Sequence, residues 1–419
     1  MIKKIVAGIC LLFSFVGAAQ EGSSSPYSYY GIGEVRFKGT AENRAMGGLM
    51  IFPDSIHMNI QNPASYPSLR LTTFTVGGTY SSTNMETETQ QSKARRTTLD
   101  YFAVGLPMGK LGVSFGLVPY SSVGYKISSE EIVGGVMTSK RATGSGGVNR
   151  AFLGAGYQIT PKFSVGADFA YNFGKIETSS IQRTEGVQLG SRELNTSLLS
   201  GASFNAGVAY QTKFNEKLQF FSALTYSFEG KLRSRNEREI ATVQFLALGG
   251  EVVSGEPIIF DPGDSELRVP GKLTFGAGIG QLRKWGVGAE ISLHDSADQS
   301  NRFVETTNTA FENAIKYNFG GYYIPNYSSY TNYFSKITYR AGLRYETTGL
   351  VIQNKSIEDA AMSLGLGFPI GGGTFSNINI GFEYGKRGTV YGGLVEENYA
   401  NFFIGLSFND RWFVKRKYD

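Results

Sequence analysis

The sequence predicts an all-β fold: an antiparallel transmembrane outer-membrane β-barrel of about 14 strands, with an N-terminal plug segment in its lumen. Three observations predict it. The chain begins with an export signal, and its composition is rich in glycine and aromatic residues. Apolar residues also alternate with small or polar ones over lengths that span a membrane.

Residues 1–19 have the organisation of a signal peptide. Lys3 and Lys4 form a basic start, a short apolar run follows, and Ala19 supplies a small residue for cleavage. We therefore expect Sec export to the outer membrane of a Gram-negative bacterium. Cys10, the only cysteine, lies inside this peptide, so the mature chain is expected to have no disulfide and no thiolate metal site.

The composition favours a membrane barrel over a soluble domain. The chain has 54 Gly, 30 Phe and 24 Tyr, an unusual load of small and aromatic residues. Removing Lys3 and Lys4 from the 40 basic residues leaves 38, against 35 acidic residues. This near balance of charge argues against nucleic acid as a partner.

The segment 162–174 displays the alternation clearly. Phe163, Phe169 and Tyr171 lie on one face of the expected strand, and Gly166 and Asp168 lie on the other. Lipid on one side and a lumen on the other produce this pattern. The same pattern gives fourteen expected strands at residues 71–81, 99–106, 111–123, 148–158, 162–174, 201–212, 218–229, 270–280, 284–294, 313–323, 337–346, 358–368, 377–386 and 398–410.

The connections between these strands indicate which way the barrel faces. Short turns alternate with longer polar segments, which are expected to be outer loops. An even number of strands returns both termini to the periplasm. The long loops are expected at residues 82–98, 124–147, 175–200, 230–269, 295–312, 347–357 and 387–397. The barrel domain is expected at residues 70–413, followed by a basic periplasmic tail at 414–419.

Residues 20–69 precede the first strand and fit neither a strand nor a long helix. Pro63 and Pro67 each remove a backbone donor, so a regular ladder cannot pass through them. The segment is fairly apolar, and the predicted lumen-facing residues are mostly small. Irregular backbone is tolerated at membrane depth when protein surrounds it, so we expect this segment to fold into the lumen as a plug.

The stretch "RAMGGLMIFPDSIHMNIQNPASY" resembles the N-terminal hatch of the FadL/TodX family of outer-membrane transporters for long-chain fatty acids and aromatic hydrocarbons. The later stretches "YRAGLRYE", "FEYGKRGT" and "FNDRWFVKRKY" are similar to the Bacteroidota-type branch of that family. The resemblance implies a plug and gating motif. Its matching positions are Gly47, Gly48, Asp54, Asn62, Pro63 and Ala64.

The resemblance implies passive uptake of hydrophobic small molecules, fatty-acid-like or hydrocarbon, with lateral release into the outer-membrane lipid at a kinked third strand. Pro119 and Gly124 in the expected third strand are candidates for this lateral gate, because proline deletes a ladder bond. Alternatively, Pro119 ends a strand at the outer rim. Relatives of such barrels also serve as subunits of secretion or assembly complexes, so a non-transporting complex subunit is the alternative function.

Two further groups of residues carry predictions. Arg340 and Arg344 face the expected lumen and could bind a fatty-acid carboxylate, although ion pairs with Asp168, Glu290 or Glu383 are the alternative. The aromatic end of the last strand resembles the signal that the barrel assembly machinery recognises; an interface girdle of aromatic residues is compatible with it. The signal residues are Gly405, Phe408, Trp412 and Phe413.

The sequence does not predict an enzyme, a metal site or a cofactor. His57 is expected in the plug and His294 at a strand end. His294 and Asp295 are adjacent on a strand and therefore point to opposite faces, so they do not form a catalytic dyad. Neither a phosphate-binding loop nor a dinucleotide fingerprint occurs in the chain.

Overall fold

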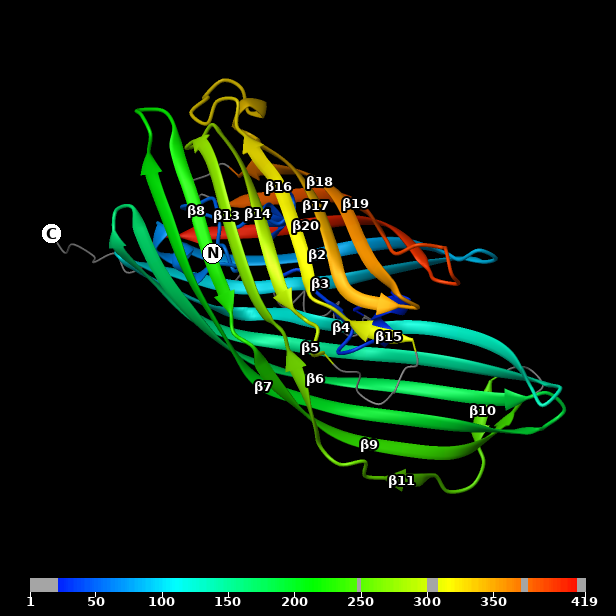
Figure 1. Cartoon of the computed structure of the whole chain (residues 1–419). Helices are drawn as coiled ribbons and strands as arrows, with labels where there is room; N and C mark the ends of the chain where they lie inside the picture. Colours follow the sequence, from blue (N-terminus) through cyan, green and yellow to red (C-terminus); the bar gives the residue numbers. More distant parts are fainter. Residues whose placement is uncertain (1–21, 247–249, 300–307, 371–375, 413–419) are drawn as a thin grey trace.

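The computed structural model describes residues 22–246, 250–299, 308–370 and 376–412. Fourteen antiparallel strands form a closed barrel, in which β20 pairs with β2 to complete the wall (Figure 1). The fold class predicted from the sequence is therefore confirmed. In order around the wall the strands are β2 (Thr72–Glu86), β3 (Gln91–Met108), β4 (Leu111–Val133), β5 (Val136–Thr160), β6 (Phe163–Thr184), β7 (Leu189–Lys213), β8 (Gln219–Ser227), β13 (Gly271–Gln281), β14 (Trp285–Asp295), β16 (Ala314–Tyr323), β17 (Thr338–Ile352), β18 (Lys355–Pro369), β19 (Asn377–Arg387) and β20 (Glu396–Asp410).

The remaining elements extend the wall or lie before it. They are η1 (Pro26–Tyr29), β1 (Glu34–Val35), α2 (Ala41–Arg44), η2 (Pro63–Ser68), β9 (Gly230–Phe245), β10 (Glu251–Val253), β11 (Ile258–Phe260), β12 (Ser265–Val269), β15 (Thr309–Phe311) and η3 (Phe334–Lys336). We call the end of the barrel where β2 begins and β20 ends the near end, and the opposite end the far end. The near end is the one predicted to face the periplasm. In the described residues, no helix is long and apolar enough to cross a membrane.

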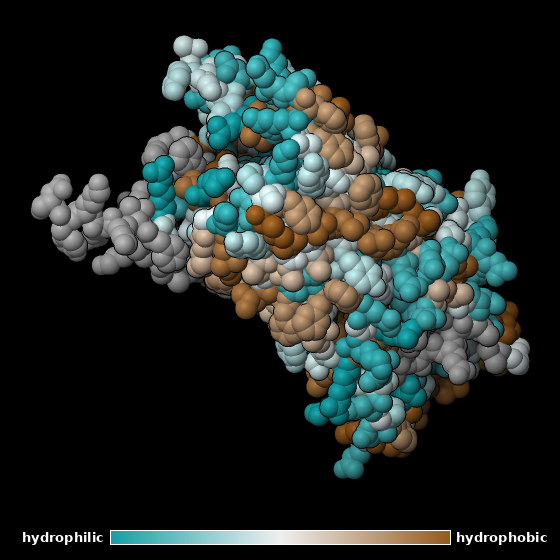
Figure 2. Space-filling view, turned by 60° about the vertical axis from the view of Figure 1, so that its left-hand side comes forward, coloured by the Kyte–Doolittle hydropathy of each residue, from teal (hydrophilic) through white to brown (hydrophobic). Residues whose placement is uncertain are grey.

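Outward apolar residues and inward polar residues alternate along the strands of the wall, as the sequence predicts. On β6, Phe169 and Tyr171 are exposed on the outside of the barrel, whereas Asp168 and Asn172 are buried on the inside. The same alternation crosses the ladder, since Phe169 is paired with Leu153 and Phe204, both of them exposed apolar residues. Figure 2 shows apolar residues gathered on the wall between hydrophilic ends. This is the surface expected of a barrel surrounded by lipid.

The long polar loops predicted between residues 82 and 269 are mostly wrong, because the strands continue through them. Strands β4 and β5 pair as far as Val133 and Val136, beyond the predicted ends of both strands. Strand β9 continues the path of β8 along β7, and β12 continues that of β13. A group of long strands therefore extends far past the shorter strands on the other side of the barrel (Figure 1). The physical reason is that polar strands pair as well as apolar ones once they leave the membrane.

The N-terminal segment, residues 22–71, contacts the inner side of the wall. At three glycines of the wall no side chain fits, because the segment's backbone comes too close. A Cβ atom would lie 2.0 Å from the Gly47 nitrogen at Gly342, and 2.3 Å from the Tyr66 carbonyl carbon at Gly112. At Gly166 it would lie 2.5 Å from the Pro63 carbonyl carbon. Small inward residues are thus what allow this close approach. The segment's role as a plug stays a prediction.

Candidate functional site

The wall has a seam between β3 and β4. At the near end of the barrel these strands pair from Phe102 with Leu117 to Met108 with Leu111, and they pair nowhere else along their length. Beyond that point, residues 91–101 of β3 are paired only with β2, and residues 118–133 of β4 are paired with β5 but not with β3. The β2–β3 and β4–β5 hairpins diverge accordingly (Figure 1).

The two predicted gate residues both lie along this seam. Pro119 lies where β4 changes register against β5, between Pro119 and Ser121. Gly124 faces the N-terminal segment, and a Cβ atom there would lie 1.9 Å from the Ser23 carbonyl oxygen. The alternative that Pro119 ends its strand is wrong, because β4 continues to Val133. Whether the seam opens stays a prediction.

Strand β1 of the N-terminal segment lies against the β4 side of the seam. Glu34 is paired with Ser122 and Val35 with Ser121, and the Arg36 N–H donates to the Tyr120 carbonyl at 2.9 Å. The Val35 side chain is 54% exposed. Residues 34–36 therefore supply backbone hydrogen bonds to β4 where β3 has diverged from it.

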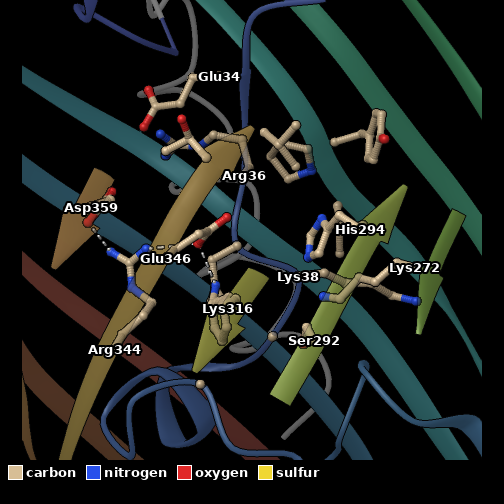
Figure 3. A pocket seen from close by; sticks show the side chains of 18 of the residues that line it. Glu34, Arg36, Lys38, Lys272, Ser292, His294, Lys316, Arg344, Glu346 and Asp359 are labelled. Atoms are coloured by element: carbon tan, nitrogen blue, oxygen red, sulfur yellow. Dashed lines mark hydrogen bonds and ion pairs between the residues drawn. The ribbon is translucent and has the colours of Figure 1, made fainter. Parts of the chain in front are cut away.

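Charged side chains join β1 to the β3 side of the seam. Arg96 Nη1 lies 3.5 Å from Glu34 Oε2, and Arg36 Nη2 lies 3.7 Å from Asp100 Oδ1. Arg387 of β19 also reaches Glu34, with 3.0 Å between Nη1 and Oε1. The seam is therefore bridged by partly buried ion pairs (Figure 3 shows Glu34 and Arg36 beside the cavity).

A second group of ion pairs lies on β17 to β20 and centres on Asp359. Its carboxylate is 1% exposed and accepts from Arg387 at 2.8 Å, Arg344 at 3.2 Å and the Tyr399 hydroxyl at 2.6 Å. Because Arg387 contacts both Asp359 and Glu34, this cluster continues into the ion pairs of the seam. Burial strengthens such pairs but makes the loss of one partner costly.

The predicted carboxylate-binding arginines have partners within the chain. Arg340 donates to Asn379 Oδ1 at 2.9 Å, and Arg344 binds Asp359 and Glu346. Of the acids expected as alternatives, Glu383 binds Arg44 and Asp168 lies 3.6 Å from Lys38. Glu290 accepts a hydrogen bond from the Met50 N–H. Arg344 thus forms ion pairs, with other acids than those expected, whereas the partner of Arg340 is the Asn379 amide. Carboxylate binding at Arg340 and Arg344 stays a prediction.

The motif shared with the FadL/TodX hatch forms turns and close contacts. Gly47 and Gly48 have φ angles of 71° and 98°, which glycine adopts without strain. Asn62 caps η2, since its Oδ1 accepts from the Ala64 N–H at 3.0 Å. Pro63 and Ala64 are buried against the wall, so the prolines fit an irregular turn rather than interrupting a strand. That these residues act in gating stays a prediction.

Asp54, the remaining residue of the motif, is paired with His57. Oδ2 of Asp54 lies 2.8 Å from Nδ1 of His57, and Oε1 of Glu42 lies 3.6 Å from Nε2. Burial opposes the charged form of His57, but the two carboxylates outweigh it and raise its pKa. The histidine therefore holds the Asp54 turn to α2 through its charge.

We expect the N-terminal segment to be held less firmly as pH rises. A pKa that is raised on folding gives stability that is complete below the unfolded-state pKa of about 6.5 and is lost as pH rises through the folded-state value. Thermal unfolding measured from about pH 6 to about pH 9 should show this loss in the native chain and a flatter profile in His57→Asn. A slope in His57→Asn identical to that of the native chain would contradict the role of His57.

The residues of the terminal signal lie at the near end of β20. A Cβ atom at Gly405 would lie 2.5 Å from the Tyr101 hydroxyl. Phe408 is paired with Phe74 in the β20–β2 ladder that closes the barrel. Phe408 is 46% exposed and Trp412 55% exposed, as expected of an aromatic girdle. Phe413, the signal peptide at 1–19 and the tail at 414–419 lie outside the described residues. The assembly signal stays a prediction.

The lumen contains a cavity of about 350 Å³ between the N-terminal segment and the wall. Residues from β13, β14, β16 and β17 line one side of it, and Lys38 of the N-terminal segment borders it (Figure 3). Many of the lining side chains are charged. They include Glu34, Arg36, Lys38, Arg44, Arg96, Asp100, Lys272, Glu290, Lys316, Arg344, Glu346, Asp359 and Arg387.

Sequence reasoning missed three features of the site: strand β1, the seam and the lysines that line the cavity. A strand of two residues has no periodicity, and the divergence of β3 from β4 leaves no pattern in either strand. Lys272 was passed over, although its inward position follows from the alternation between exposed Leu273 and buried Thr274. That alternation was the one available signal.

A closed fourteen-stranded antiparallel barrel with an N-terminal segment against its inner wall defines the class: a β-barrel with the fold of the FadL-type proteins. A family model described as BamG matches residues 1–419, and the chain belongs to the BamG family. A comparison with curated proteins finds no match.

Solved structures share the fold at low sequence identity. The toluene transporter TodX of Pseudomonas putida is 15% identical with a TM-score of 0.59, covering 90% of this chain and 100% of that one. The CymD monoaromatic hydrocarbon channel is 13% identical with a TM-score of 0.58, covering 89% and 98%. A FadL homologue of Pseudomonas aeruginosa is 12% identical with a TM-score of 0.54, covering 91% and 99%. The first two of these neighbours are a transporter and a channel.

Proposed function

We propose that this chain is a plugged, non-transporting barrel subunit of an outer-membrane complex that assembles or secretes proteins. The observation that supports it best is the number of charged side chains that line the lumen cavity. The cavity is bordered by buried ion pairs such as Asp359 with Arg387 and Glu383 with Arg44. The family name BamG also hints at a partnership in a complex.

A polar lumen is a poor path for an apolar molecule. Its free energy falls by about 25 cal/mol for each Å² of its apolar surface that is removed from water into apolar surroundings. Charged side chains are not such surroundings, so they provide little of this stabilisation. Displacing β1 from the seam would also separate Glu34 from Arg96 and Arg387. Leaving one buried charge unpaired costs about 3–5 kcal/mol. The N-terminal segment therefore functions as a fixed stopper in this proposal.

The second candidate function is a passive channel for hydrophobic small molecules with lateral release. The seam between β3 and β4 favours it, because these two strands share no ladder bonds beyond Phe102 and Leu117, and an opening there would give a side exit. Two of the fold neighbours are a toluene transporter and a monoaromatic hydrocarbon channel. In this candidate, β1 would leave the seam for each molecule that passes.

Purification from native membranes in mild detergent, with mass spectrometry of both protein and lipid extract, separates the two functions. A stoichiometric protein partner with no apolar ligand is expected. Deleting the gene that encodes this chain should then lower the amounts of other outer-membrane proteins and leave toluene uptake unchanged. A lone barrel carrying a hydrocarbon or fatty acid, together with lost uptake on deletion, would overturn the subunit proposal and favour the channel.

A further inference from the structure

Three lysines and a histidine meet at one side of the lumen cavity. We call Lys38, Lys272, Lys316 and His294 the lysine cluster (Figure 3). They come from the N-terminal segment, β13, β16 and β14. The cavity of about 350 Å³ has room for a small ligand beside them.

The ladder register brings the wall members together. Lys272 of β13 is paired with His294 of β14. Lys316 of β16 is paired with Ser292, which lies two residues before His294 on β14. Their outward neighbours Leu273 and Leu293 are exposed on the lipid side. By alternation, Lys272 and His294 therefore face the lumen.

Two of the acids near the cluster already pair with its own lysines Lys316 and Lys38, and among the described residues no acid forms an ion pair with Lys272. Glu346 lies 3.2 Å from Lys316 and also binds Arg344 at 3.4 Å, and Asp168 lies 3.6 Å from Lys38. Glu290 interacts with the cluster only at longer range and accepts from the Met50 N–H. Each of these acids therefore already has a partner.

Two groups of the cluster remain without a partner in the described part of the chain. Lys272 has no ion pair within 4.0 Å, although Lys316 and Lys38 are both close enough to repel it. The Nε2 atom of His294 is buried and has no hydrogen-bond partner. An unpaired ammonium in a low-dielectric site and an unsatisfied imidazole are both costly.

We propose that the lysine cluster binds an anion carrying a phosphate or carboxylate group. One such group would satisfy Lys272 and His294 Nε2 together and offset the repulsion between Lys272 and Lys316. Lysine binds these groups as a point charge and needs no bidentate geometry, which suits three ammonium groups from separate elements. Because Lys38 belongs to the N-terminal segment, the anion would also join that segment to the wall. This inference depends on neither proposed function.

Calorimetric titration of the full-length purified barrel with inorganic phosphate and with octanoate tests the site. Saturable binding is expected, and Lys272→Gln should weaken it about tenfold or more, because a charged contact is removed from a partly desolvated site. Lys272→Arg should retain binding. Lys231→Gln is the matched control, since Lys231 is an exposed lysine paired with Glu266 on the outer face of β9.

The two ligands distinguish the source of the anion. Binding of phosphate alone supports a phosphate-bearing ligand, and binding of octanoate alone supports a carboxylate with an apolar tail. Saturable binding of neither would overturn the proposal, as would equal weakening by Lys272→Gln and Lys231→Gln. Heat-modifiability on gels reports whether each variant is folded. If Lys272→Gln is unfolded, Lys272→Met takes its place, because it removes the charge and keeps a long side chain. Weakened binding in folded Lys272→Met with retained binding in Lys231→Gln supports the anion at Lys272, and equal binding in both would reject it.

Discussion

Asp359→Ala is expected to lower the free energy of unfolding by about 3–5 kcal/mol, because it removes the buried carboxylate that two buried arginines share. Asp359 is 1% exposed and accepts hydrogen bonds from Arg344, Arg387 and Tyr399. Removing the carboxylate places two guanidinium groups side by side in the lumen. Urea unfolding in detergent micelles, followed by the change in gel mobility, measures the loss.

Glu266→Ala is the matched control for this substitution. Glu266 is paired with Lys231 at 2.7 Å, but both side chains are 64% exposed. An exposed pair is worth about 0–1 kcal/mol, so little change is expected. If Asp359→Ala unfolds at the same urea concentration as Glu266→Ala, the buried cluster does not stabilise the barrel as described.

Phe169→Arg is expected to destabilise the barrel by about 2–4 kcal/mol, because an arginine near the middle of the lipid face must leave water. Phe169 is 44% exposed on the outside of β6, and its ring lies 5.2 Å from that of Phe204 on β7. Folding of the urea-denatured chain into lipid vesicles, followed by heat-modifiability, measures the effect.

Phe169→Leu separates the effect of charge from the loss of the ring contact. Leucine remains apolar, so this variant should lose only the contact with Phe204, about 0.5–1.5 kcal/mol. Equal destabilisation by arginine and leucine would mean that position 169 does not face lipid, and the assignment of the two faces of β6 would have to be reversed.

The wall of the barrel could be predicted because its signal is local. Lipid on one side requires an apolar residue at every second position, and Phe163, Phe169 and Tyr171 display this without any knowledge of the fold. The ends of the strands could not be predicted in the same way. Once β4 to β7 leave the membrane, both of their faces can be polar, so a continuing strand such as 124–133 looks like a loop.

The sequence by itself determined the fourteen strands, their facing and the irregular turn at Pro63 and Pro67. Each depends on residues that are neighbours in the chain, or on the fixed period of an extended backbone. Only the tertiary structure decided the seam between β3 and β4, the pairing of β1 with Ser121 and Ser122, and the partners of Arg344 and Lys272. The contact of Glu34 with Arg387 joins residues 353 positions apart, and it exists because closure of the barrel brings β19 and the N-terminal segment together. Inward charges at every second position are visible in the sequence, but their partners depend on the register of every strand between them.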